Sequence, residues 1–290
     1  MKKIIKKTTD SAVVGMVSAI LIIGLIVAVI SIIQVIYVPV IMEQREAEHM
    51  DKVTEQFGSL TSVIDSQAAN ERKGIPIATF VTLGNEDLPF LVSSKAFGTL
   101  EILDNARTIT ITNKSGGTSK AFPIGLITYS SENAYFLDQL YTYEAGAMIV
   151  SQSQGNSMIC RPGFSVDYNS MTNIVNISFD VVNISSYGQK TIAGGSGTYP
   201  IHTEFLDIST NKIFTNVRNV TIATPFSNAW SIFINRSLLD ADLTYGSQFL
   251  LTDTGQALKI DFPSSGFPPT VNIILKIINI RAQIGPGWAG

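Results

Sequence analysis

The chain has 290 residues, a formal net charge of −3 at pH 7 and 15% charged residues, well below the about 25% of an average soluble protein. Outside the first ten residues it has no basic cluster, so we expect no nucleic acid partner. Its single cysteine, Cys160, excludes an intramolecular disulfide. We expect this thiol to be a small buried residue, with an intermolecular bridge or a reactive site as the alternative.

The N-terminal part of the chain has the pattern of a membrane helix. Residues 11–42 carry no charge, and residues 12–36 are almost wholly apolar. About 20 apolar residues in a helix span a bilayer core of about 30 Å. Four lysines precede the run, so the positive-inside bias predicts a cytoplasmic N-terminus and an extracellular remainder: Lys2, Lys3, Lys6 and Lys7. The alternative is a cleaved secretory signal peptide, which needs a shorter apolar core and a small-residue cleavage site.

Residues 40–69 predict an amphipathic helix that continues the membrane helix outward. Apolar side chains recur there at spacings of three and four: Ala47, Met50, Val53, Phe57, Leu60 and Ile64. Charged side chains fill the positions between them, and His49 is assigned to the same polar side. Pro39 is a candidate kink where the helix leaves the lipid. Gly74 and Pro76 end the helix.

From Pro76 onward the chain predicts mostly short strands separated by turns rich in Gly, Pro, Asn and Ser. The clearest strand is IVNISFDVVNI at 174–184, in which apolar and polar residues alternate. One helix is predicted at 229–240, from apolar residues at helical spacing: Trp230, Phe233, Ile234 and Leu238. Many short strands between turns favour an antiparallel sandwich or barrel.

The predicted fold class is therefore α+β: a long N-terminal transmembrane and amphipathic helix, followed by an antiparallel β-sandwich or barrel-like domain. The predicted parts are a cytoplasmic basic leader at 1–10, a transmembrane hydrophobic helix at 11–38, an extracellular amphipathic helix at 39–73 and an extracellular β-rich domain at 74–290.

No residue pattern points to catalysis, a cofactor or a metal. Neither His49 nor His202 has a second His, Cys or clustered carboxylate at ligand spacing. The nucleophile-elbow, Walker and dinucleotide-binding motifs are absent. Two carboxylate pairs, Glu86 with Asp87 and Asp240 with Asp242, are typical of solvated turns. We therefore do not expect an enzyme.

Five N-x-S/T tripeptides lie in the segment predicted to be outside the cell, at Asn113, Asn176, Asn183, Asn219 and Asn235. They are candidate N-glycosylation sites, since glycosylation requires an exposed site on that side of the membrane. The alternative is that Asn, Ser and Thr are simply abundant in turn-rich β domains.

A resemblance to a known family covers about residues 6–70 and 140–195, and the amphipathic segment EQREAEHMDKVTEQFGSLTSVIDSQ at 43–67 is part of it. The run KKTTDSAVVGMVSAILIIGLIVAVI at 6–30 resembles the N-terminus of archaeal type IV pilin-like proteins, with a short basic leader, an acidic residue and an unbroken apolar helix. The segment YTYEAGAMIVSQSQGNSMICRPGFSV at 141–166 resembles a strand and loop of uncharacterised archaeal pilin-like membrane proteins. The resemblance implies an extracellular β domain on a pilin-type hydrophobic helix. It also implies a leader that a prepilin peptidase could cut between Lys7 and Thr8.

We therefore expect an archaeal pilin-like cell-surface structural protein, a filament subunit or minor pilin with a role in adhesion. Its expected partners are the lipid bilayer, through residues 11–38, and identical subunits, through the N-terminal helix. The alternative is a single-pass surface protein that binds a partner or a sugar without forming filaments, and an extracellular enzyme is a weaker third reading. The expected location is the cell membrane, or a surface filament after processing.

Overall fold

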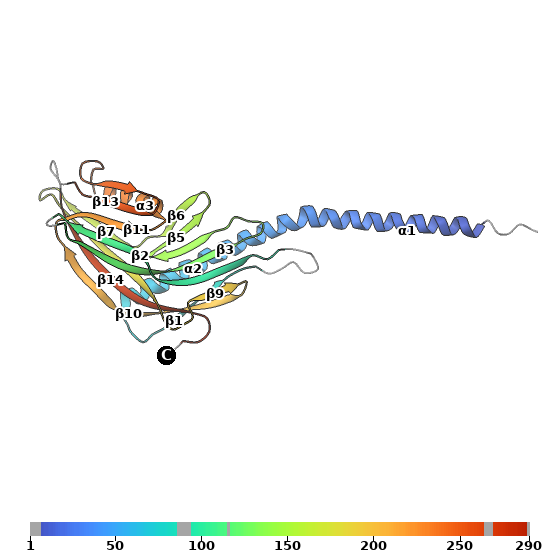
Figure 1. The fold of residues 1–290 in the computed structure, drawn as a ribbon, viewed down its shortest axis with the longest axis horizontal. Coiled ribbons are helices and arrows are strands. Elements are labelled where there is room, and N and C mark those ends of the chain that lie inside the picture. Colours follow the sequence, from blue (N-terminus) through green and yellow to red (C-terminus); the bar gives the residue numbers. More distant parts are fainter. Residues whose placement is uncertain (1–6, 86–93, 115–116, 264–268, 289–290) are drawn as a thin grey trace, which may run out of the picture.

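The computed structural model describes residues 7–85, 94–114, 117–263 and 269–288. Figure 1 shows one long helix that projects from a β-rich head. The helical elements are α1 (Lys7–Ile32), the π-helical turn η1 (Ile33–Tyr37), α2 (Val38–Asn70) and α3 (Ser227–Asp240). The strands are β1 (Ile77–Thr82), β2 (Phe97–Asn113), β3 (Ser119–Glu132), β4 (Leu140–Glu144), β5 (Ala147–Gln152), β6 (Gly155–Cys160), β7 (Gly163–Asn169), β8 (Ile174–Ser186), β9 (Ile192–Gly195), β10 (Thr198–Phe214), β11 (Val217–Ala223), β12 (Leu250–Asp253), β13 (Ala257–Asp261) and β14 (Thr270–Ile284).

The strands form two curled sheets. One has five strands in the order β1-β10-β14-β8-β7. The other has nine, eight of them in the order β12-β13-β11-β2-β3-β4-β5-β6, with β9 paired to β2. The expected antiparallel arrangement is wrong for one pair of described strands, β14 and β8, which run parallel from Thr270↔Ile174 to Ala282↔Ser186. A parallel pair needs a long connection, and five strands and α3 lie between these two in the chain.

The core lies between the two sheets. One apolar cluster joins Ile109 of β2, Ile177 of β8 and Trp230 of α3, and a second joins both sheets to α2. The predicted strand at 174–184 is confirmed as β8, with Val175 buried and Asn176 only half-buried. The predicted helix at 229–240 is confirmed as α3. The broad prediction of a long N-terminal helix before a largely β domain is confirmed.

The long helix changes its surroundings at Val38. Residues 13–32 are exposed around the whole helix. From Val38 onward one face is buried: Val38, Met42, Glu46, His49, Met50, Val53, Phe57, Leu60, Thr61, Ile64, Gln67 and Ala68. The apolar spacing predicted this stripe, but it did not predict that the stripe completes the core of the head. The outer half of the helix is a structural element of the β domain.

Two polar residues on this buried face correct the sequence prediction. His49, assigned to the polar side, is buried because β1 crosses the helix there, and the His49 Nε2 atom lies 2.9 Å from the Thr82 carbonyl oxygen. Glu46, one of the charged residues between the apolar positions, is fully buried as well, because a loop of the head closes over it. Helical periodicity predicts where the apolar stripe lies. It does not predict which polar residues beside that stripe become buried, because their hydrogen-bond partners lie far away in the sequence.

A π-helical turn carries the helix past Pro39. The Val38 N–H bonds the Ile33 carbonyl oxygen, five residues back rather than four. Proline has no N–H, and its ring crowds the preceding helical turn. One wider turn ahead of Pro39 accommodates both constraints while the helix continues. The exposed and buried halves are therefore parts of one uninterrupted helix.

The packing of α2 predicts where the chain can be cut. A fragment beginning at Val38 should unfold cooperatively on heating, whereas one beginning at Gly74 should not, because it lacks the buried face of α2. Even the single change Phe57→Ala in the longer fragment should cost about 3–5 kcal/mol. Circular dichroism during thermal unfolding measures both effects, with Glu55→Ala on the exposed face as the control. Equal cooperativity of the two fragments would show that α2 is not part of the core.

The burial of His49 predicts a pH dependence of stability. Burial lowers the pKa of His49, and Lys52 adds to the effect, although the bond to the Thr82 backbone and the charge of Glu46 oppose it. The unfolded chain then takes up a proton near pH 6.5 while the folded chain does not, so stability falls as the pH drops through that value. His49→Gln should flatten this part of the melting-temperature profile, and His202→Gln should leave it in place. A wild-type profile identical to that of His49→Gln would contradict the assignment.

Candidate functional site

The first feature with functional potential is the exposed apolar helix. Among the described residues one helix, Val13–Asn70, is long and apolar enough to cross a membrane. Its apolar side chains are bare, with Ile20 61% and Leu25 66% exposed. At about 1.5 Å of rise per residue, residues 13–37 form roughly 37 Å of helix, somewhat more than a bilayer core. This helix fits a membrane anchor or a signal sequence.

A buried carboxylate ties the head to the helix just beyond this exposed segment. The oxygens of Glu46 accept the backbone N–H groups of Ala134, Tyr135 and Phe136 at 3.1, 2.7 and 2.7 Å. Three successive N–H groups converge on one carboxylate, which is the geometry of an anion-binding nest. The ring of Tyr135 also packs against Val38 and Met42. The loop between β3 and β4 is therefore attached to the helix by both charge and packing.

A second buried carboxylate, Glu144, organises the interior of the head. It is 1% exposed and accepts hydrogen bonds from Thr224 Oγ1 at 2.7 Å, Trp230 Nε1 at 2.7 Å and Arg107 Nε at 3.1 Å. Burial raises the pKa of Glu144, while the bonds from Thr224 and Trp230 and the charge of Arg107 oppose that shift. The network joins β2, β4 and the start of α3.

Local backbone features aim these side chains at one another. Glu144 ends β4 and is followed by the two-residue turn Ala145-Gly146, with φ values of 53° and 90°. Positive φ at both positions is the type I′ hairpin geometry, which favours glycine. β2 loses register with β3 between Leu103 and Arg107. Such a bulge turns a side chain away from its regular direction.

Arg107 lines an open cleft of about 440 Å³, which we call the β2–β5 cleft. Its guanidinium carbon lies 5.8 Å from the centre of the Phe226 ring, and its side chain stays 23% exposed. The cleft is lined by one arginine, one aromatic ring and otherwise aliphatic, hydroxyl and amide side chains: Leu103, Arg107, Leu126, Thr128, Leu140, Thr142, Ser151, Asn156, Pro225 and Phe226. A rigid cation thus faces a mixed polar and apolar hollow.

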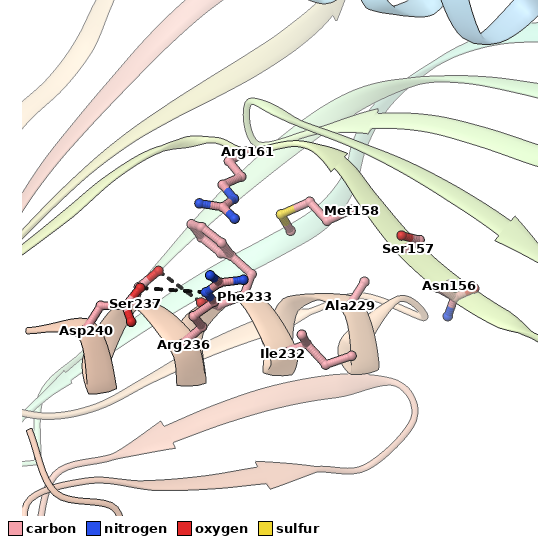
Figure 2. Close-up of a pocket in the computed structure, with 10 residues that line it drawn as sticks. All are labelled: Asn156, Ser157, Met158, Arg161, Ala229, Ile232, Phe233, Arg236, Ser237 and Asp240. Carbon is pink, nitrogen blue, oxygen red and sulfur yellow. Dashed lines mark hydrogen bonds and ion pairs between the residues drawn. The ribbon is translucent and has the colours of Figure 1, made fainter.

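A second hollow of about 160 Å³, which we call the α3 groove, lies between α3 and β6. Figure 2 shows its lining: Asn156, Ser157, Met158, Arg161, Ala229, Ile232, Phe233, Arg236, Ser237 and Asp240. Arg161 extends from the chain beyond β6 toward Phe233, and Arg236 stands on α3 beside the same ring (Figure 2). Arg236 pairs with Asp240 at 3.8 Å, and both side chains are more than two-thirds exposed, at 71% and 72%. Asn156 belongs to both hollows.

The candidate glycosylation sites lie on the head, and none of the five is fully exposed: Asn113, Asn176, Asn183, Asn219 and Asn235. Two of them belong to an amide ladder between the parallel strands. Asn176 Oδ1 accepts from Asn272 at 3.0 Å, and Asn183 Nδ2 donates to Asn279 at 2.8 Å. A glycan would replace one of the two protons on Nδ2, the atom through which Asn183 bonds Asn279. Occupancy of these sites stays a prediction.

The remaining expected residues are scattered. Lys7 and Thr8 begin α1, and leader cleavage there stays a prediction. Cys160 is only partly buried, with its Sγ 3.9 Å from Met148 Sδ. Of the two carboxylate pairs, Glu86 with Asp87 lies outside the described residues, and Asp240 belongs to the α3 groove. Within the described ranges no group of three or more His, Cys, Asp or Glu residues could hold a metal ion.

Comparison with known proteins gives one match. A model of a family of unknown function (DUF7289) matches residues 11–248, from the start of the apolar helix to just beyond α3. No match was found among curated proteins or among solved structures. The match includes both the helix and most of the head.

The Glu144 network should matter to stability far more than a surface ion pair. Glu144→Gln removes the charge opposite the mostly buried Arg107 and should lower the free energy of unfolding by about 2 kcal/mol. Asp240→Asn breaks the exposed pair with Arg236 and should change it by less than about 0.5 kcal/mol. Denaturant unfolding of the two variants beside the wild type makes the comparison. Equal losses would contradict an organising role for Glu144.

Proposed function

Since this chain belongs to a family of unknown function (DUF7289), we propose its role from its own geometry: it is a pilin-like cell-surface protein. Its apolar helix serves first as a membrane anchor and then as the packing core of a filament. The main observation behind this proposal is one uninterrupted helix, of which residues 13–32 are exposed on all sides while the part from Val38 onward is built into the head. The resemblance of residues 6–70 to archaeal type IV pilin-like proteins adds support.

The physical reason is the need to cover apolar surface. A helix that is apolar on every side, as at Ile20, Leu25 and Val29, needs an apolar environment all around it. Lipid supplies that environment in the membrane, and copies of the same helix supply it outside the membrane. Because the head is fixed to the helix through Glu46 and the α2 face, heads of neighbouring copies would coat such a bundle.

The proposed topology has a cytoplasmic leader at residues 1–10 and an extracellular head. The lysines before the apolar run and the five tripeptides beyond it support this orientation. We class the head as a β-sandwich, because its two sheets share apolar clusters between them.

The second candidate function is a lone membrane anchor that binds a partner or sugar through its head. The specific observation in its favour is the β2–β5 cleft, where Arg107 is held by Glu144 but stays partly accessible. Both candidates place the head outside the cell. They differ in what surrounds residues 13–37 once the protein is mature.

The change Leu25→Glu separates the filament from the anchor. On insertion scales a carboxylate at the centre of a membrane helix costs only about 2.5–3.5 kcal/mol, which so long an apolar run can absorb. In a bundle of helices the same charge has no lipid surface to reach, and every subunit repeats the penalty. Membrane insertion should therefore persist while surface filaments disappear, and the apolar control Leu25→Phe should keep both.

Electron microscopy of sheared surface fractions, with membrane fractionation of the same cells, provides the readout. N-terminal sequencing of the mature chain accompanies it. A wild-type protein that never occurs in filaments and keeps its residues 1–7 would overturn the pilin-like proposal in favour of the lone anchor.

A further inference from the structure

We propose that the β2–β5 cleft and the α3 groove together bind an acidic glycan, a sugar chain that carries carboxylate groups. This site lies on the head and leaves the exposed helix free. The inference therefore goes beyond the pilin-like role and holds equally for a filament subunit and for a lone anchor.

The two hollows adjoin at Asn156. This side chain lines both, and its Nδ2 donates to Asn228 Oδ1 on α3 at 2.7 Å. Pro225 and Phe226, just before α3, line the cleft, while the groove follows α3 from Ala229 onward. The combined lining thus continues from the segment that leads into α3 onto α3 itself. This shape suits an extended chain of several linked units better than one compact molecule.

The charge of the hollows is opposite to that of the whole chain. The chain has a net charge of −3 and seven arginines, of which Arg107, Arg161 and Arg236 line the two hollows. Asp240 is the one acidic residue among the described lining. The planar guanidinium group matches a carboxylate, with which it can form two parallel hydrogen bonds. The hollows therefore favour an anionic ligand.

Each arginine has donors left for a ligand. Arg161 has neither a hydrogen bond nor an ion pair within the described chain, although it faces the groove. Arg236 shares only a long, exposed contact with Asp240, which a better-placed carboxylate can replace. Arg107 uses Nε for Glu144 and Nη1 for the Ala106 carbonyl, and its Nη2 has no partner among the described residues. Glu144 neutralises part of the charge of Arg107. Arg107 therefore serves more to orient a ligand through directed hydrogen bonds than to add net positive charge.

The remaining lining favours a sugar over an acidic peptide. Partly exposed hydroxyl and amide side chains line the hollows together with apolar ones, which matches the hydroxyl edges and C–H faces of a sugar ring: Thr128, Ser151, Asn156, Leu140 and Phe233. A peptide in extended form is usually recognised through backbone hydrogen bonds to a free strand edge. β6 is the last strand of its sheet, but α3 packs beside it, and the lining is made of side chains from the strands and from α3. Sugar hydroxyls are therefore the better match.

Isothermal titration of the full-length protein in lipid nanodiscs tests the proposal, with tetragalacturonate as the probe and neutral maltotetraose as its uncharged counterpart. Tetragalacturonate should bind and maltotetraose should bind at least about tenfold more weakly, since charge-assisted hydrogen bonds are lost. Arg161→Gln and Arg236→Gln should each weaken binding of tetragalacturonate about tenfold. Both side chains are exposed, so neither variant should lower the melting temperature.

The matched control is Arg218→Gln, which removes the same charge from an exposed site outside both hollows. It should leave the affinity unchanged. An equal loss of affinity in Arg218→Gln would show that the arginines act only through non-specific attraction. If the wild-type protein does not bind tetragalacturonate, the site is rejected. An octaglutamate peptide that binds in its place, with the same dependence on Arg161 and Arg236, would reject the glycan in favour of an acidic peptide. None of these outcomes bears on filament formation, so failure here stays separate from failure of the pilin-like role.

Discussion

One continuous helix is exposed along its first part and buried in the head along its second. The arrangement of the whole molecule depends on the residue at which the first part ends and the second begins. From Val13 to Ile32 the side chains are exposed all around the helix, and most of them are apolar. From Val38 it presents one apolar stripe, and both sheets close around that stripe. Burying side chains such as Phe57 and Leu60 contributes about 1.5–3 kcal/mol each. The head and the exposed helix are therefore one mechanical unit.

That unit separates two tasks in space. The exposed helix leaves the head at one end, while α3 lies toward the opposite part of the head (Figure 1). A ligand beside α3 and a membrane or helix bundle around residues 13–37 can therefore be engaged at the same time. The Glu46 nest supports this division, because it fixes the loop between β3 and β4 to the helix without occupying either hollow.

Local patterns in the sequence predicted what depends on local physics. The length and apolarity of the N-terminal run predicted the exposed helix. Alternation of apolar and polar residues predicted β8, and apolar residues at helical spacing predicted α3. The parallel pairing of β8 with β14 could not be predicted, because nothing within either strand specifies a partner strand about a hundred residues away. The Asn176 and Asn183 amide bonds depend on that pairing, so the tripeptides alone could not show them.

The buried charges escaped prediction for a related reason. Glu46 looked like any other acidic residue on an amphipathic helix, since its partners lie 88 to 90 residues further along. Glu144 did leave a signal: it is the single charged residue in the otherwise uncharged segment 139–160. A lone carboxylate in such a segment has to find donors when it is buried. Its pairing with Arg107 still required the bulge in β2, which no spacing rule anticipates.

Hydrogen–deuterium exchange of the full-length protein in lipid nanodiscs tests most directly whether the helix and head are one unit. Amides from Val53 to Ile64 should exchange as slowly as those of β14, and the two groups should lose protection together as denaturant is added. Exchange of the helical amides well before those of β14 would contradict the account, because it would show a helix that merely lies beside an independently stable β domain.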